Sequence, residues 1–183
     1  MKEIRFHGRR LPRYDHTAPF VEAARLLAQA ALAEGKQVQL RPPWLFLRGY
    51  SPEVAHLRVD TEPIETYSQE YILDLVAVTD ATILTEVKVS TGLKENGVLL
   101  VNSNSPVSVN TRARVVVADL SGIAGQFRVD LAIPVAAAAA ALSRVVDRKA
   151  LSQFLQVKNR DAARRQLLQA LQAASQAVGV RAK

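Results

Sequence analysis

Residues 2–13 read KEIRFHGRRLPR, and this pattern sets the fold that we expect for the chain. Ile4 and Phe6 alternate with charged or polar neighbours, which predicts a strand over residues 2–7. Residues 8–15, with a proline among charged side chains, indicate a loop. A strand that ends in a loop before a helix is the first unit of a doubly wound α/β sheet.

Helices and strands alternate after this first unit. Pro19 suits the first turn of a helix with apolar residues at helical spacing, and Gly35 ends that helix. The pattern predicts an α/β fold, namely a three-layer, Rossmann-like, mostly parallel sheet with helices on both faces. Further strands are expected at residues 37–40, 53–60, 73–78, 97–102 and 114–119, a helix or helical turn at 81–90, and a turn at 94–97.

The C-terminal part, about residues 128–183, is expected to be mainly helical. It contains six consecutive alanines at residues 136–141, whose small side chains favour a packing face. Apolar residues at helical spacing follow at 163–178, and Gly179 ends the last helix. There is no internal repeat or long linker, so we expect one domain over residues 1–183.

The residue types limit the chemistry of this chain. It contains no cysteine, which excludes disulfides, thiolate nucleophiles and iron–sulfur clusters bound through its own thiolates. His7, His16 and His56 are the only histidines, and none stands at metal-ligand spacing or beside a catalytic partner in the sequence. We therefore predict no catalytic residue and no metal site.

Charge and hydropathy bear on location and partners. Residues 1–143 carry 15 Lys/Arg and 15 Asp/Glu, whereas residues 144–183 carry 9 Lys/Arg and 2 Asp/Glu, which accounts for the net charge of +7. Such asymmetry is typical either of a solvated helical face or of a surface for nucleic acid or an acidic partner. No apolar run reaches membrane-spanning length and the first residues lack a signal-peptide pattern, so we expect a cytoplasmic protein.

Four segments carry a resemblance to a known family. In their order and spacing they resemble the gamma subunit, or gamma domain, of pyruvate and related 2-oxoacid:ferredoxin oxidoreductases, and the resemblance covers about residues 3–178. The segments are IRFHGR at residues 4–9, Arg48-Gly49 before Glu53-Val54, Pro63-Ile64 before residues 73–80, and GLKENGVLLVNS at residues 92–103.

The chain departs from the family pattern in its first loop. The family continues its first strand into glycine-arginine-glycine-glycine-glutamine-glycine, of which Gly8 and Arg9 match. The next four residues, RLPR at 10–13, replace glycines that would let backbone amides approach a phosphate. Because Pro12 has no amide hydrogen, the loop cannot form the same backbone cradle.

The resemblance implies an accessory role. Its family carries out oxidative decarboxylation of a 2-oxoacid on thiamine diphosphate, passes electrons through iron–sulfur clusters to ferredoxin, and forms acyl-coenzyme A. Those cofactors are held largely by other subunits, so this chain is expected to bind none alone and not to act alone. The implied partners are alpha, beta and delta-type subunits, with ferredoxin reached through the complex.

Eight residues are predicted to contribute to binding. Those in the first loop lie at the carboxyl end of the first strand, where open α/β sheets bind ligands, and their guanidinium groups could bind a phosphate or an acidic segment. Arg48 and Gly49 belong to a segment rich in residue types that are common at protein interfaces. Asn102 and Ser103 follow an expected central strand, where their side chains could bind a ligand. The candidates are Gly8, Arg9, Arg10, Arg13, Arg48, Gly49, Asn102 and Ser103.

Two other functions stay open from the sequence. A stand-alone scaffold or binding module that retains the gamma fold and forms a homodimer would also explain the altered loop. Nucleic-acid binding through the basic C-terminal helices is a further alternative, although no stacking aromatic residue lies among the basic ones. A nicotinamide dehydrogenase is excluded because the loop lacks the required glycines.

Overall fold

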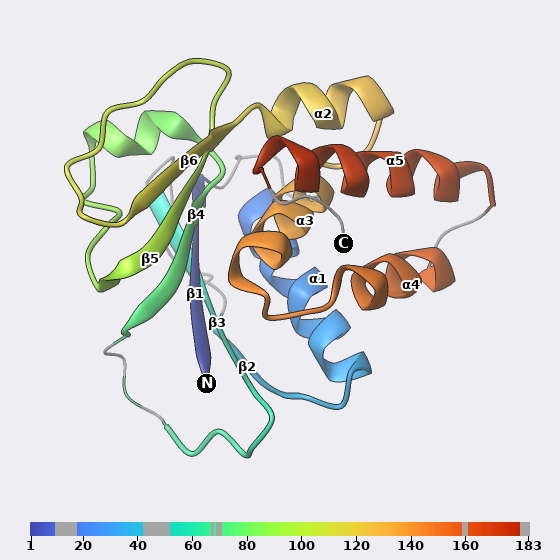
Figure 1. Cartoon of the computed structure of the whole chain (residues 1–183), viewed down its shortest axis with the longest axis horizontal. Helices are drawn as coiled ribbons and strands as arrows, with labels where there is room; N and C mark the ends of the chain where they lie inside the picture. Colours follow the sequence, from blue (N-terminus) through green and yellow to red (C-terminus); the bar gives the residue numbers. More distant parts are fainter. Residues whose placement is uncertain (10–17, 42–51, 67, 69–70, 159–160, 180–183) are drawn as a thin grey trace.

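The computed structural model describes residues 1–9, 18–41, 52–66, 68, 71–158 and 161–179. Its centre is a sheet in the order β2-β3-β1-β4-β5-β6 (Figure 1). In chain order the strands are β1 (Lys2–Arg9), β2 (Gln37–Arg41), β3 (Pro52–Asp60), β4 (Leu73–Val78), β5 (Leu93–Asn102) and β6 (Arg114–Ala118). The predicted strands are therefore all present in the sheet.

The sheet is mixed, with a parallel majority. The pairs β1–β4, β4–β5 and β5–β6 are parallel, whereas β3 pairs antiparallel with both β1 and β2. The expected simple β-loop-α-β opening is modified here, because β3 lies between β1 and β2 and separates them. Periodicity could not reveal this, since the alternation of a half-buried strand is the same for either direction.

The α-helices gather on one face of the sheet (Figure 1). They share one apolar core with the inner residues of β1, β3 and β4, including Phe6, Leu57 and Leu75. On the other face, within the described residues, the 3-10 helix η1 (Ala81–Thr85) covers a smaller apolar cluster. The predicted α/β class is confirmed; the helices are α1 (Pro19–Ala33), α2 (Leu120–Phe127), α3 (Ala132–Ser143), α4 (Arg148–Lys158) and α5 (Asp161–Ala177).

The alanine run forms the middle of α3. Residues 136–140 are each at most 3% exposed, and α3 packs against α1, α5 and the sheet. A helix that is apolar on every side must be buried all round, and small side chains let it fit between neighbouring helices. The prediction that the alanines form a packing face is confirmed.

Two local predictions differ in detail from the structure. The helix or helical turn expected at 81–90 is present as the short 3-10 helix η1, which is confined to Ala81–Thr85 and begins where the Asp80 side chain accepts a hydrogen bond from the amide of Thr82. The expected turn at 94–97 lies inside β5, and the turn comes earlier, at Gly92, whose φ of +79° suits glycine. Polar residues on a partly exposed strand resemble a turn when only their composition is considered.

A buried ion pair joins β1 to β3 on the face away from the α-helices. The guanidinium of Arg58 is 1% exposed and donates through Nε to Glu3 at 2.6 Å. Its remaining nitrogens donate to the Gln39 side chain on β2 and to the carbonyls of Thr66 and Ser68. The second oxygen of Glu3 accepts from the amide of Ile72 at 2.6 Å. One pair therefore ties three strands to the connection between β3 and β4.

Arg58→Ala should destabilise the fold strongly, because it leaves the Glu3 carboxylate buried without its counter-charge. We expect a loss of about 3–5 kcal/mol in the free energy of unfolding, measured by urea denaturation. Arg112→Ala is the matched control. The Arg112 side chain is 84% exposed and that of its partner Glu95 is 73% exposed, so this ion pair should contribute at most about 1 kcal/mol. Equal losses in the two variants would contradict the assigned role of Arg58.

Candidate functional site

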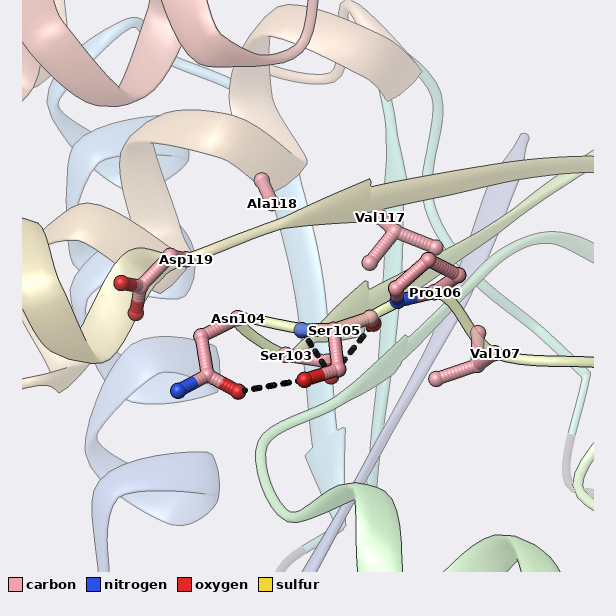
Figure 2. Close-up of a pocket in the computed structure, with 8 residues that line it drawn as sticks. All are labelled: Ser103, Asn104, Ser105, Pro106, Val107, Val117, Ala118 and Asp119. Atoms are coloured by element: carbon pink, nitrogen blue, oxygen red, sulfur yellow. Dashed lines mark hydrogen bonds between the residues drawn. The ribbon is translucent and has the colours of Figure 1, made fainter.

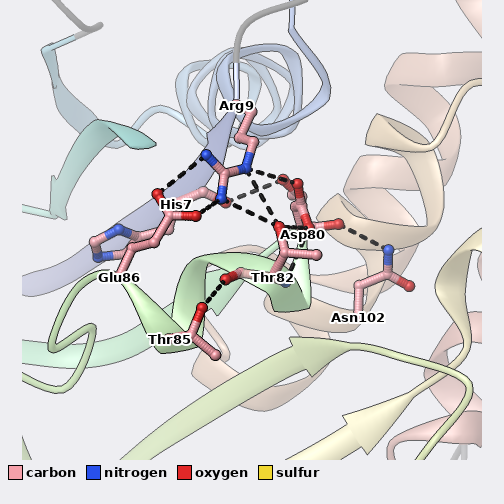
Figure 3. A network of polar contacts seen from close by, with 8 residues as sticks. His7, Arg9, Asp80, Thr82, Thr85, Glu86 and Asn102 are labelled. Carbon is pink, nitrogen blue, oxygen red and sulfur yellow. Dashed lines mark hydrogen bonds and ion pairs between the residues drawn. The ribbon is translucent and has the colours of Figure 1, made fainter. Parts of the chain in front are cut away.

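The candidate site is the edge where the parallel strands end. Arg9 ends β1, Asp80 follows β4, and Asn102 ends β5. Because the carboxyl ends of parallel strands meet at one edge, these three side chains from distant parts of the sequence come together (Figure 3). Sequence reasoning named Arg9 and Asn102 here but did not single out Asp80.

Arg9 is surrounded by acceptors from η1 and its flanks. Its Nε lies 3.2 Å from Asp80 Oδ2 and 3.3 Å from the Thr82 hydroxyl, and both terminal nitrogens donate to the Glu86 carboxylate (Figure 3). The hydrogen bond to Glu86 raises the pKa of Arg9 above its ordinary value. The cation predicted to bind an external anion thus faces two carboxylates of its own chain, and it fastens η1 to β1.

Gly8 is required for packing. A Cβ built at this position would lie 2.4 Å from the Phe20 ring and 2.6 Å from the Thr79 hydroxyl. The Thr79 hydroxyl in turn donates to the carbonyl of His7 at 3.0 Å. The absence of a side chain at Gly8 lets α1 lie directly on the end of β1, which gives this glycine a structural function independent of any ligand.

Asn102 bridges three elements. Its Nδ2 donates to the carbonyl of Thr79 at 2.9 Å and to the Ser121 hydroxyl at 2.8 Å, while its Oδ1 accepts from the amide of Ser121 at 3.0 Å. The residue is 8% exposed. The predicted ligand-binding amide is therefore occupied in joining the ends of β4 and β5 to the first turn of α2.

Ser103 begins a polar turn beside an open depression of about 450 Å³. Its hydroxyl donates to the carbonyl of Ser105 at 2.8 Å and accepts from the amide of the same residue at 3.1 Å (Figure 2). This is ordinary turn chemistry. The depression is lined by Ser103, Asn104, Ser105, Pro106, Val107, Val117, Ala118 and Asp119.

The other predicted binding residues cannot be placed at this edge. Arg10, Arg13, Arg48 and Gly49 lie outside the described residues. Their assignment as binding residues stays a prediction from the sequence.

A polar cluster on the sheet face away from the α-helices was not predicted. His56 stacks on Tyr71 with ring centroids 3.8 Å apart, and Arg5 is the cross-strand neighbour of His56. Both ring nitrogens of His7 are buried without a hydrogen-bond partner in the described part of the chain. Burial, with Arg5 nearby, lowers the pKa of His7 to about 4, and the same causes lower the pKa of His56 to about 3.

The described residues contain no group of three or more His, Asp or Glu side chains arranged to bind a metal. None of the described helices has the length and apolar character needed to cross a membrane. The protein is thus an α/β domain in which polar side chains of the chain itself join the carboxyl ends of the parallel strands.

The chain belongs to the pyruvate ferredoxin/flavodoxin oxidoreductase family, whose model matches residues 20–180. Among curated relatives, pyruvate synthase subunit PorC of Methanosarcina barkeri is 38% identical over 127 residues, which are 68% of this chain and 66% of the relative. The common subunit gamma of pyruvate/ketoisovalerate oxidoreductases from Pyrococcus abyssi is 43% identical over 103 residues, which are 56% of this chain and 52% of the relative. The matches thus span about half to two thirds of these relatives' length.

Solved structures agree with the fold. Pyruvate oxidoreductase subunit PORC of Thermotoga maritima aligns with a TM-score of 0.78 at 26% identity, over 96% of this chain and 95% of that one. The gamma subunit of a keto/oxoacid ferredoxin oxidoreductase from Geobacter sulfurreducens aligns with a TM-score of 0.77 at 20% identity, over 99% and 98% of the two chains. The resemblance stated from four short segments is confirmed.

Asn102→Asp tests the structural function of the bridging amide. The new carboxylate cannot donate to the carbonyl of Thr79, so two buried acceptors would face each other, at a cost of about 1–3 kcal/mol in the free energy of unfolding. Asn104→Asp, in the exposed turn nearby, should change it by less than about 0.5 kcal/mol. Thermal or urea unfolding of both variants measures the difference, and an unchanged Asn102→Asp midpoint would refute the bridge.

The buried histidines predict acid sensitivity. Because the pKa of His7 is lowered to about 4 in the folded chain, the unfolded chain takes up a proton first, near pH 6.5. The contribution of His7 to the free energy of unfolding is therefore fully present above pH 6.5. It is lost as the pH drops toward 4, and the loss is on the order of 3 kcal/mol. His7→Gln should flatten this part of the curve of unfolding free energy against pH. An unchanged slope would show that His7 is not the responsible group.

Proposed function

We propose that this chain is an accessory, gamma-type subunit of a 2-oxoacid:ferredoxin oxidoreductase. The family match over residues 20–180 is the observation that supports this most directly. The site is consistent with it, because Arg9 and Asn102 hold the strand ends together and offer no evident nucleophile or acid–base pair. The chain would therefore contribute to assembly and to the shape of the complex, without a catalytic group of its own.

The cofactors of the proposed reaction would reside on partner subunits. Iron–sulfur clusters are held by cysteine thiolates, and this chain has no cysteine, so its residues do not fit a cluster. A diphosphate cofactor is commonly held through a divalent cation with oxygen ligands, and the described residues contain no acidic group of that kind. The clusters would thus lie on the partner subunits, and we propose that thiamine diphosphate and coenzyme A are bound in the assembled complex and not by this chain alone.

The proposed partners are alpha, beta and delta-type subunits, and ferredoxin would receive electrons through the complex. Oxidative decarboxylation of a 2-oxoacid to an acyl-coenzyme A is the reaction that the complex would carry out, in the cytoplasm. Arg10, Arg13, Arg48 and Gly49, which lie outside the described residues, stay predicted contact residues for these partners.

Assembly is the direct test. The full chain, co-expressed with the thiamine-binding and cluster-binding subunits of its source, should elute with them at constant stoichiometry in gel filtration with light scattering. The iron should accompany the partners, and the chain purified alone should contain none. Elution of this chain alone, or as a homodimer beside a complete complex of the others, would contradict the proposed function.

A further inference from the structure

Strand β5 contains a bulge over residues 94–97. Its pairing with β4 is interrupted after Leu93 and resumes at Val98, and its pairing with β6 also begins at Val98. Asp74 alone spans the same interval in β4. Extra residues in one strand leave the ladder unpaired at that place. In the described sheet, the register therefore gives residues 94–97 no cross-strand partner.

The bulge requires glycine at position 97. A Cβ built on Gly97 would lie 2.9 Å from the carbonyl oxygen of Lys94 and 3.1 Å from that of Asp74. Both of these atoms belong to the backbone, which cannot rotate away as the end of a long side chain can. The geometry of the strand thus ensures that Asn96 is followed by glycine.

Asn96 has the surroundings that an attack by its own backbone needs. Its side chain is exposed to water, whereas Gly97 is buried. Rotation of the Asn96 side chain brings its Cγ next to the backbone nitrogen of Gly97, and glycine has no side chain to hinder this approach. Two reacting groups held so close in one chain have a high effective concentration. Because no cross-strand partner holds the bulge, the ladder does not oppose the approach.

We propose that Asn96 is a site of spontaneous deamidation in the folded chain. The backbone nitrogen of Gly97 attacks Cγ of Asn96 and closes a succinimide ring. The bond between Cγ and Nδ2 breaks, and ammonia leaves with the proton of the backbone amide. Water then opens the ring at either of its carbonyl groups, which leaves aspartate or isoaspartate at position 96. The reaction consumes only water, and it does not depend on the proposed function of the chain.

The two products differ in their effect on β5. Aspartate adds a negative charge and keeps the length of the backbone. Isoaspartate carries the backbone through its side-chain methylene, so the chain gains one carbon atom before Gly97. Since Gly97 lies directly against two backbone carbonyls, the added length displaces it together with Val98, where pairing with β4 resumes. Isoaspartate, and not aspartate, should therefore loosen the pairing of β5 with β4.

Peptide mass spectrometry of the full chain, kept folded at mildly alkaline pH, tests the site. Asn96 should deamidate at least about tenfold faster than Asn110, which is also exposed but precedes the β-branched Thr111. Both isoaspartate and aspartate should form, and the rate should rise with pH because the attacking nitrogen has to lose its proton. Equal rates at the two asparagines, formation of aspartate alone, or deamidation of Asn96 only after unfolding in urea would overturn the proposal.

Asn96→Gln is the matched control. It keeps the amide group, but its longer side chain would have to close a larger and less favourable ring. This variant should stay intact at position 96 under the conditions that deamidate the wild type. Loss of its amide at the wild-type rate would overturn the proposed route through the backbone nitrogen of Gly97.

Asn96→Asp separates the effect of the charge from that of the lengthened backbone. Ion exchange separates the deamidated wild-type protein, and fragmentation identifies its isoaspartate fraction. In that fraction, amide hydrogen exchange at Val98 and Leu99 should be about tenfold faster than in the unmodified chain. Asn96→Asp should exchange there at the unmodified rate. Equal exchange in the isoaspartate fraction and in Asn96→Asp would overturn the assigned effect on β5.

Discussion

The buried pair between Arg58 and Glu3 is the constraint on which the arrangement of the sheet depends. A charge removed from water is tolerated only when its partner and its remaining hydrogen bonds are provided. Arg58 on β3 therefore has to lie beside Glu3 on β1 and next to Gln39 on β2. The position of β3 between the other two strands meets this requirement, with Glu3 opposite Arg58 and Arg58 opposite Gln39.

The same principle operates at the carboxyl edge, with consequences for function. There Arg9 faces Asp80 and Glu86, and Asn102 joins Thr79 to Ser121. Polar side chains at the end of parallel strands are the usual means of binding a ligand, but here they hold the domain's own elements together. The described residues at this edge thus serve the domain's own packing, in agreement with an accessory subunit.

Much of the fold could be predicted because apolar residues recur in the sequence at the spacing of the buried face of each helix or strand. Strand Leu73–Val78, the first helix and the alanine-rich α3 were all expected within a few residues of their bounds. The direction and place of β3 were not, since periodicity reports burial and not pairing partners. At the site, Arg9 and Asn102 were named from their position after strands, but their partners lie 71 and 23 residues away, and only the folded chain shows which acceptors they meet.

We propose that an oxidoreductase complex needs this chain although the chain performs none of the chemistry. The most direct measurement is 2-oxoacid-dependent reduction of ferredoxin or a viologen dye, with the chain alone, with the partner subunits alone, and with all of them combined. We predict no reduction by the chain alone, impaired reduction by the partners alone, and full activity when the chain is added. Turnover by the chain alone, or full activity without it, would contradict this account.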